Sequence, residues 1–222
     1  MTKLFEKYRP DAWSGVIGQD KVIRQLDVIR KRNGTLGGQA YFLSGATGTG
    51  KTTIARLIAS EVADAYAIEE LIDPTEVTPA WLQSLPNEMR VRPLGEKRGR
   101  AYIVNEVHGL RADQVRRLLG ILEPAGGLPP WCVFCFTTTT DGAAKLFDDC
   151  DDASPFLSRC VDLALSRRDL AQAFAARALE IARAESLDGQ PIEKYVKLAQ
   201  TCKNNFRAML QAIEAGCMAE PR

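Results

Sequence analysis

The chain has 222 residues, and its 29 lysines and arginines nearly balance its 28 aspartates and glutamates. This length can bury a substantial core and indicates one large domain, alone or with a small one. The balanced charge gives no argument for a nucleic-acid or membrane partner, so only local basic clusters could provide one. No run approaches the roughly 18 apolar residues of a membrane span, and charges interrupt the first ten residues, so we expect a cytoplasmic protein with no membrane partner.

Leu4–Pro10 opens the chain, and the segment 16–19 (Val-Ile-Gly-Gln) follows it. The spacing of Val22, Leu26 and Ile29 predicts a helix over 20–32, which Asn33-Gly34 ends.

The next stretch is a nucleotide-phosphate loop. The run 39–44 is short and apolar and predicts a buried strand, whereas 52–60 predicts a helix. Between them the sequence satisfies each fixed position of the pattern G-x-x-x-x-G-K-[ST], whose backbone amides surround the phosphates at a helix N-terminus. Lys51 is expected to contact the β- and γ-phosphates, and the Thr52 hydroxyl to bind Mg²⁺. The expected nucleotide-binding residues here are Gly45, Ala46, Thr47, Gly48, Thr49, Gly50, Lys51, Thr52 and Thr53.

The middle of the chain continues the alternation of strands and helices. A short strand is predicted at 71–73, a helix at 79–89, and a basic loop at 90–100 that leads into the apolar strand 101–106. A helix follows at 112–123, with arginines on its outer face, and Pro124 stops it. The run 131–136 predicts the next buried strand, which ends in four threonines.

Six cysteines are scattered through the chain, and a core of this size needs no disulfide bonds. They are Cys132, Cys135, Cys150, Cys160, Cys202 and Cys217. Cys132 and Cys135 form a C-x-x-C pair inside the predicted strand, with no second pair of metal ligands after it. We expect reduced thiols, and a metal or redox role for this pair is the alternative.

From Ser166 the pattern changes to helices without strands, at 168–185, 192–202 and 204–218. The sequence therefore predicts an α/β fold, with a parallel sheet flanked by helices over residues 1–164 and a three-helix lid over 165–222.

Several motifs together resemble the AAA+ clamp-loader ATPases, a family that includes replication factor C small subunits and bacterial DNA polymerase III clamp-loader subunits. They are Glu6-Lys7-Tyr8-Arg9-Pro10, Val16-Ile17-Gly18-Gln19, the phosphate loop, Asn105-Glu106-Val107-His108 and Ser158-Arg159-Cys160. The resemblance implies a P-loop AAA+ sheet with a helical lid, and ATP with Mg²⁺ as cofactors. It also implies base and ribose contacts from Tyr8, Arg9, Pro10, Val16 and Ile17. Packing at a domain edge is the alternative for Tyr8 and Ile17.

The resemblance also assigns the catalytic groups. Glu106 matches the carboxylate that activates water, whereas Asn105 stands where the family has a metal-binding aspartate. We therefore expect slow turnover that Asn105→Asp would raise, unless Asp73 or Asp141 supplies the carboxylate.

Three further positions are assigned by the same resemblance. Thr139, or next Thr140, matches the residue that senses the γ-phosphate, although a hydrogen-bonded turn is the alternative. Arg159 matches the finger that reaches a neighbouring subunit's nucleotide, and Arg207 the lid residue that reports the γ-phosphate, where an exposed arginine is the alternative. His108 is interpreted as structural.

The implied function is an ATP-hydrolysing subunit of a ring that opens or loads a sliding clamp on primer-template DNA. The implied partners are other AAA+ subunits, the clamp and DNA, in the nucleoid of a bacterial or viral system or in a eukaryotic nucleus. Three arginines either contact DNA phosphates or form a solvated face: Arg111, Arg116 and Arg117. A nucleotide-dependent scaffold with little hydrolysis is the alternative function. We expect the chain to lack the C-terminal collar domain of the family, as a compact ATPase core, a divergent member or a fragment of a longer protein. The phosphate loop alone does not exclude GTP.

Overall fold

The protein is described by a computed structural model that covers residues 2–123, 128–149 and 152–219. The chain divides into two compact units. The sheet unit comprises Lys21–Gly45 and Lys51–Leu165, and the helical unit comprises Met1–Asp20, Ala46–Gly50 and Ser166–Arg222. The boundary after Leu165 lies one residue beyond the one predicted from sequence, and the helical unit also takes in the first twenty residues and part of the phosphate loop.

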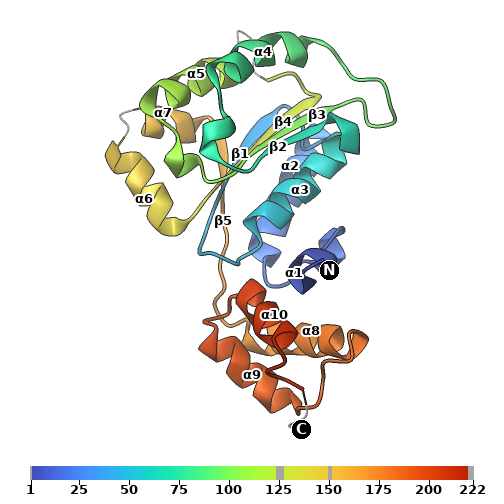
Figure 1. The fold of residues 1–222 in the computed structure, drawn as a ribbon. Coiled ribbons are helices and arrows are strands. Elements are labelled where there is room, and N and C mark those ends of the chain that lie inside the picture. The colour runs from blue at the N-terminus through green and yellow to red at the C-terminus, as the bar shows by residue number, and fades with distance from the viewer. Residues whose placement is uncertain (1, 124–127, 150–151, 220–222) are drawn as a thin grey trace. The chain divides into compact units, whose positions relative to one another are not determined.

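The sheet unit is built on five parallel strands in the described residues (Figure 1). Their order in the sheet is β2-β3-β4-β1-β5. Strands buried on both faces read as continuous apolar runs, and β4 is buried along its whole length. The predicted α/β class is therefore confirmed. The strands are β1 (Gln39–Ser44), β2 (Ile68–Leu71), β3 (Arg100–Val104), β4 (Cys132–Thr138) and β5 (Cys160–Ala164).

Helices cover both faces of this sheet. Figure 1 shows α2 and α3 on one side and α4, α5 and α7 on the other. On the second side the rings of Tyr102, Phe134 and Phe136 stack, and Phe156 meets Phe136 edge-on, so the four form one aromatic core. The helices are α2 (Asp20–Asn33), α3 (Lys51–Val62), α4 (Pro79–Arg90), α5 (Ala112–Leu122), α6 (Thr140–Asp149) and α7 (Ala153–Ser158), with short 3-10 turns η2 (Ala65–Ala67), η3 (Pro74–Glu76) and η4 (Val107–Gly109).

Three strand predictions were wrong in their limits. The strand predicted at 101–106 is β3, which spans Arg100–Val104, so Asn105 and Glu106 follow it. The strand predicted at 71–73 is β2, which ends at Leu71, because Asp73 instead caps η3 by accepting a hydrogen bond from the Thr75 amide. The strand predicted to end at Phe136 continues to Thr138, because β1 pairs with it as far as Ser44. The elements β5, α6 and α7 were not predicted as separate elements.

The helical unit holds the predicted three-helix lid. Its elements are α1 (Leu4–Lys7), η1 (Trp13–Gly15), α8 (Ala171–Ala184), α9 (Ile192–Thr201) and α10 (Phe206–Glu214). Apolar side chains that recur on one face of each helix form a common core, which includes Phe174, Ile181, Tyr195 and Leu210. The N-terminal segment belongs to this core, because Leu4 is buried in it.

Candidate nucleotide and metal site

Polar groups gather where β1, β4 and β3 end side by side. Gly45 follows β1, Asn105 follows β3, and Thr137 and Thr138 complete β4. Since parallel strands place their carboxyl ends at one edge, this is the usual ligand edge of an open α/β sheet. Helix α3 begins at Lys51, the lysine of the phosphate-loop pattern.

Lys51 is buried at this edge, where a charged side chain must be paired. Its Nζ donates to the Gly45 carbonyl at 2.8 Å. The ammonium is therefore held at the start of the loop, the position from which it would contact nucleotide phosphates.

Gly48, in the helical unit, has the conformation that the loop pattern requires. Its φ of +83° lies in the left-handed region, where glycine carries little strain. A Cβ added there would lie 2.0 Å from the side-chain oxygen of Asn205. Within the same loop, the Thr49 hydroxyl donates to the Ala46 carbonyl at 2.8 Å, and Arg167 donates to the Thr47 carbonyl at 3.2 Å.

Asn105 is the most extensively hydrogen-bonded side chain of the site. It is 7% exposed. Its carbonyl oxygen accepts from the hydroxyls of Thr52 at 3.2 Å and Thr137 at 2.9 Å. Its amide donates to Glu70 Oε1 at 3.1 Å and to the Leu71 carbonyl at 3.2 Å. Because both acceptor and both donor positions are used, the orientation of the amide is fixed.

The donors at this edge fit a magnesium ion. The oxygens of Thr52 and Asn105 lie together and are hard ligands, and the Glu70 carboxylate contacts Asn105. Mg²⁺ usually takes one or two carboxylates plus phosphate oxygens and keeps several waters. Among the described residues there is no cluster of three or more His, Cys, Asp or Glu side chains able to hold a metal ion.

Glu106 has a backbone conformation that non-glycine residues seldom adopt. Its φ of 53° and ψ of 44° are left-handed, a strain of about 1–3 kcal/mol that is often found at functional sites. The side chain is 46% exposed, and its Oε2 lies 3.4 Å from His108 Nδ1. The carboxylate is therefore accessible for the predicted work on water.

His108 bridges two elements of the sheet unit. Its Nδ1 lies 3.0 Å from the Thr138 hydroxyl, and a Cβ added to Gly142 would meet this nitrogen at 2.5 Å. These contacts agree with the structural interpretation of His108.

Thr137, which was not among the candidates expected from sequence, contacts Asn105. The Thr139 hydroxyl accepts from the Gly142 amide at 2.9 Å, which caps the first turn of α6. Thr137 instead reaches Asn105, because β4 extends further than predicted. Thr140 is exposed at the start of α6.

Arg159 follows α7 in the sheet unit, and its side chain makes a hydrogen bond and an ion pair within its own chain. Its guanidinium donates to the Pro155 carbonyl at 2.7 Å and pairs with Glu123 at the end of α5. Its side chain is 26% exposed, whereas that of Glu123 is 62% exposed. The ion pair therefore lies near the surface, where water screens it.

The remaining nucleotide-binding candidates lie in the helical unit, where each makes contacts within that unit. The Tyr8 hydroxyl donates to Glu185 at 2.5 Å, and this hydrogen bond raises the pKa of Tyr8. Arg9 pairs with Glu6 at 2.5 Å. Ile17 packs against the helical core, and Pro10 and Val16 are half-buried. Arg207 is exposed, with its guanidinium 5.2 Å from the centre of the Phe5 ring.

The candidate DNA arginines are exposed at the start and on the outer face of α5. Arg111 pairs with Asp113 at 3.3 Å and Arg116 with Asp152 at 3.0 Å. Contact with DNA phosphates would therefore replace two ion pairs within the chain.

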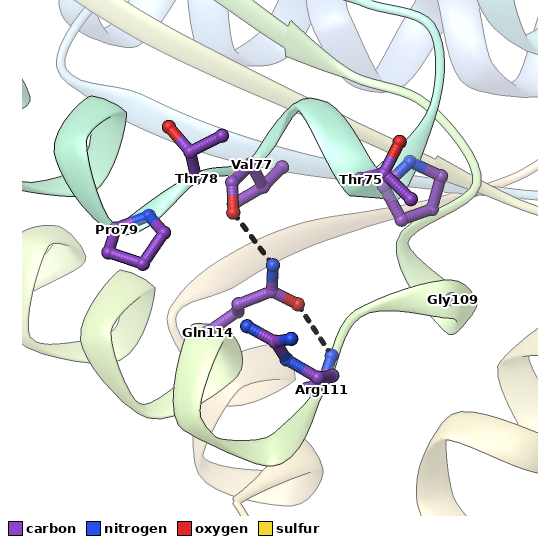
Figure 2. Close-up of a pocket in the computed structure, with 8 residues that line it drawn as sticks. Thr75, Val77, Thr78, Pro79, Gly109, Arg111 and Gln114 are labelled. Atoms are coloured by element: carbon purple, nitrogen blue, oxygen red, sulfur yellow. Dashed lines mark hydrogen bonds between the residues drawn. The ribbon is translucent and has the colours of Figure 1, made fainter.

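A pocket of about 300 Å³ lies beside α4 and α5 in the sheet unit (Figure 2). Gln114 crosses it, donating to the Val77 carbonyl at 2.7 Å and accepting from the Arg111 amide at 2.7 Å. The lining residues are Pro74, Thr75, Val77, Thr78, Pro79, Gly109, Arg111 and Gln114. None of the nucleotide or metal candidates lines it.

Cys132 and Cys135 lie in the buried strand β4. Burial raises the pKa of Cys132 to about 12 and also raises the pKa of Cys135. Both thiols therefore resist conversion to the thiolate that metal binding and redox chemistry require. Cys150 lies outside the described residues, as does Pro124.

Comparisons with known proteins point to one group of relatives. No family model matches the sequence. The tau/gamma subunit of DNA polymerase III from Haemophilus influenzae is 30% identical over 96% of this chain and 32% of its own length. The gamma/tau subunit from Mycoplasma pneumoniae is 27% identical over 95% of this chain and 32% of its length, and the tau subunit from Bacillus subtilis is 26% identical over 83% and 34%. The chain thus spans about a third of these relatives.

The fold is also shared with solved structures. A single-residue variant of RuvB from Thermotoga maritima superimposes with a TM-score of 0.69 at 20% identity, over 93% of this chain and 64% of that one. At this identity the likeness concerns the fold. No helix in the described part of the chain has the length and apolarity to cross a membrane.

Proposed function

We propose, for a chain whose homologues are clamp-loader subunits of DNA polymerase III with an AAA+ fold, that it binds ATP with Mg²⁺ as one subunit of a clamp-loader-like ring. One observation carries the proposal. A buried lysine, a helix N-terminus, two hydroxyls and a strained glutamate meet at one edge of the parallel sheet. Phosphoryl transfer needs this combination of positive charge, metal donors and a carboxylate for water.

Each group has a separate task in this proposal. Lys51 binds the β- and γ-phosphates, and Thr52 and Asn105 hold the ion. Bound Mg²⁺ neutralises charge on those phosphate oxygens. Glu106 orients the attacking water, for which its exposed carboxylate is suited.

The proposed partners follow from the relatives. We propose that other AAA+ subunits complete a ring, in which Arg159 reaches the neighbour's nucleotide, and that the ring acts on a sliding clamp and primer-template DNA. The surface position of the Arg159–Glu123 pair supports this role, because a screened ion pair releases its arginine at small cost.

A second function is a scaffold that binds nucleotide with little hydrolysis. Asn105 favours it, since the amide lacks the negative charge of an aspartate at this position. Steady-state ATP hydrolysis, with and without primed DNA and a clamp, distinguishes the two functions. Turnover that depends on Glu106 supports the motor, and unchanged turnover in Glu106→Gln counts against it.

Nucleotide binding itself is tested with Lys51→Ala. We expect the full chain to bind ATP in calorimetry and the variant to lose at least tenfold in affinity, because the buried ammonium is gone. GTP is measured in parallel, since both nucleotides share the phosphates. The unfolding of the variant without nucleotide controls for its fold. Equal affinity of the two proteins would refute the assignment of the loop.

A further inference from the structure

We propose that Glu70 supplies, through Asn105, the negative charge that the metal site lacks at position 105. Glu70 lies on β2, beside β3, and was not among the candidates expected from sequence. The inference rests on the proposed function, because it concerns how the same nucleotide site holds its ion. Glu70 is a positioning residue here, acting through the Asn105 side chain.

The contacts of Glu70 are specific. One carboxylate oxygen accepts from the Asn105 amide at 3.1 Å, and the other accepts from Arg56 Nε on α3 at 2.7 Å. The Glu70 side chain is 19% exposed. The carboxylate is therefore held from two sides, with one oxygen directed at the group that follows β3.

Hydrogen bonding transmits this charge across the amide of Asn105. An amide that donates to a carboxylate carries more negative charge on its own carbonyl oxygen, as do metal ligands supported by an outer carboxylate. The Asn105 carbonyl oxygen points the other way, toward Thr52, the expected ligand of Mg²⁺. Asn105 thus keeps its oxygen on the Thr52 hydroxyl, the expected ligand of the ion, while Glu70 provides the charge behind it.

The opposite orientation of the amide is unfavourable. Turning it would place the carbonyl oxygen against Glu70 and the Leu71 carbonyl, which are both acceptors. It would also direct the amide group at the Thr52 and Thr137 hydroxyls. The two acceptors on β2 therefore select asparagine at position 105 and fix its oxygen on the metal side.

The two carboxylates that the sequence suggested as alternative metal ligands, Asp73 and Asp141, lie in other surroundings. Asp73 accepts from the backbone and hydroxyl of Thr75, so it caps η3. Asp141 is exposed in the first turn of α6. Glu70 is the carboxylate that contacts Asn105.

The test measures metal affinity rather than turnover. Mn²⁺ binding to the full chain saturated with ADP is followed by electron paramagnetic resonance. We expect Glu70→Gln to weaken Mn²⁺ binding by about tenfold, the usual effect of losing an outer-shell partner. Glu69→Gln is the matched control, because its carboxylate lies on the next residue of the strand and accepts from Trp81 instead. Equal Mn²⁺ affinity in Glu70→Gln and the unsubstituted chain would overturn the proposal.

A double variant tests whether the charge acts through position 105. In Glu70→Gln/Asn105→Asp the carboxylate is placed at position 105 instead of position 70. We expect Mn²⁺ affinity to return to within about threefold of that of the unsubstituted chain. An affinity as low as that of Glu70→Gln alone would refute transmission through Asn105. Failure of the unsubstituted chain to bind ADP would instead refute the proposed function, so the two failures are distinguishable.

Discussion

Asn105→Asp is expected to destabilise the nucleotide-free protein, although aspartate is the residue that the resemblance leads one to restore. The substitution replaces an amide donor by a carboxylate oxygen, 3.1 Å from the carboxylate of Glu70 and 3.2 Å from the Leu71 carbonyl. A hydrogen bond becomes a repulsion between like charges, at a position that is 7% exposed.

The contact distance sets the size of this effect. Two unit charges at this separation repel by about 5 kcal/mol at an effective dielectric constant of 20, which is an upper limit. Arg56 offsets part of the negative charge of Glu70. The two carboxylates at positions 70 and 105 can also relieve their repulsion when one of them takes up a proton. We therefore expect a loss of about 1–3 kcal/mol in the free energy of unfolding at pH 7.

The assay is urea unfolding of the full chain followed by tryptophan fluorescence, since Trp81 and Trp131 both lie in the sheet unit. Repulsion raises the pKa of one carboxyl in the folded variant, so the folded state binds more protons than the unfolded one. The loss should therefore grow as pH rises from about 4 to 7. Adding Glu70→Gln should remove it. An Asn105→Asp protein as stable as the original at both pH values would refute the reasoning.

Three further variants test other parts of the structure. Gly48→Ala should cost about 1–2 kcal/mol of stability, because alanine is strained at a φ of +83°, and thermal unfolding measures the loss. Arg159→Ala should leave ATP affinity of the isolated subunit unchanged and lower hydrolysis only where subunits assemble, so an equal decrease at all protein concentrations would contradict a role in trans. Neutralising the α5 arginines should lower the slope of DNA affinity against salt by about one for each arginine that binds a phosphate, and an unchanged slope would return them to a solvated face. These arginines are Arg111, Arg116 and Arg117.

The sheet and lid could be predicted from sequence because their signals are local. The strand at Gln39–Ser44 was predicted to the residue, since an apolar run between a glycine turn and the phosphate loop leaves little freedom. The three lid helices were also predicted, from the apolar faces that form their common core.

The ends of strands could not be predicted in this way, because they depend on which neighbouring strand each one pairs with. Leu71-Ile72-Asp73 looks like a strand by residue type, yet Asp73 is more favourable as a cap of η3. Threonines 137 and 138 look like a turn, yet they continue β4 because Leu43 and Ser44 of β1 pair with them. A single sequence contains the residue preferences but not the partner that decides between them.

The same limitation explains why Glu70 was missed. Two adjacent glutamates in a short segment read as solvated charge, and their roles separate only when the strand is placed at Ile68–Leu71. Successive residues of a strand then point to opposite faces, so Glu69 meets Trp81 while Glu70 meets Arg56 and Asn105. With the strand misplaced by three residues, this alternation cannot be read.

Asn105 and Glu70 are consequently best understood as one feature of the site. Considered alone, Asn105 weakens the metal site relative to aspartate, because an uncharged amide replaces the carboxylate that Mg²⁺ prefers. Considered with Glu70, it keeps an oxygen toward Thr52, gives both acceptors on β2 a donor, and leaves one carboxylate behind the metal position instead of two in contact. An amide that appears damaging in the sequence is therefore matched by a carboxylate in contact with it, and its cost depends on a residue 35 positions away.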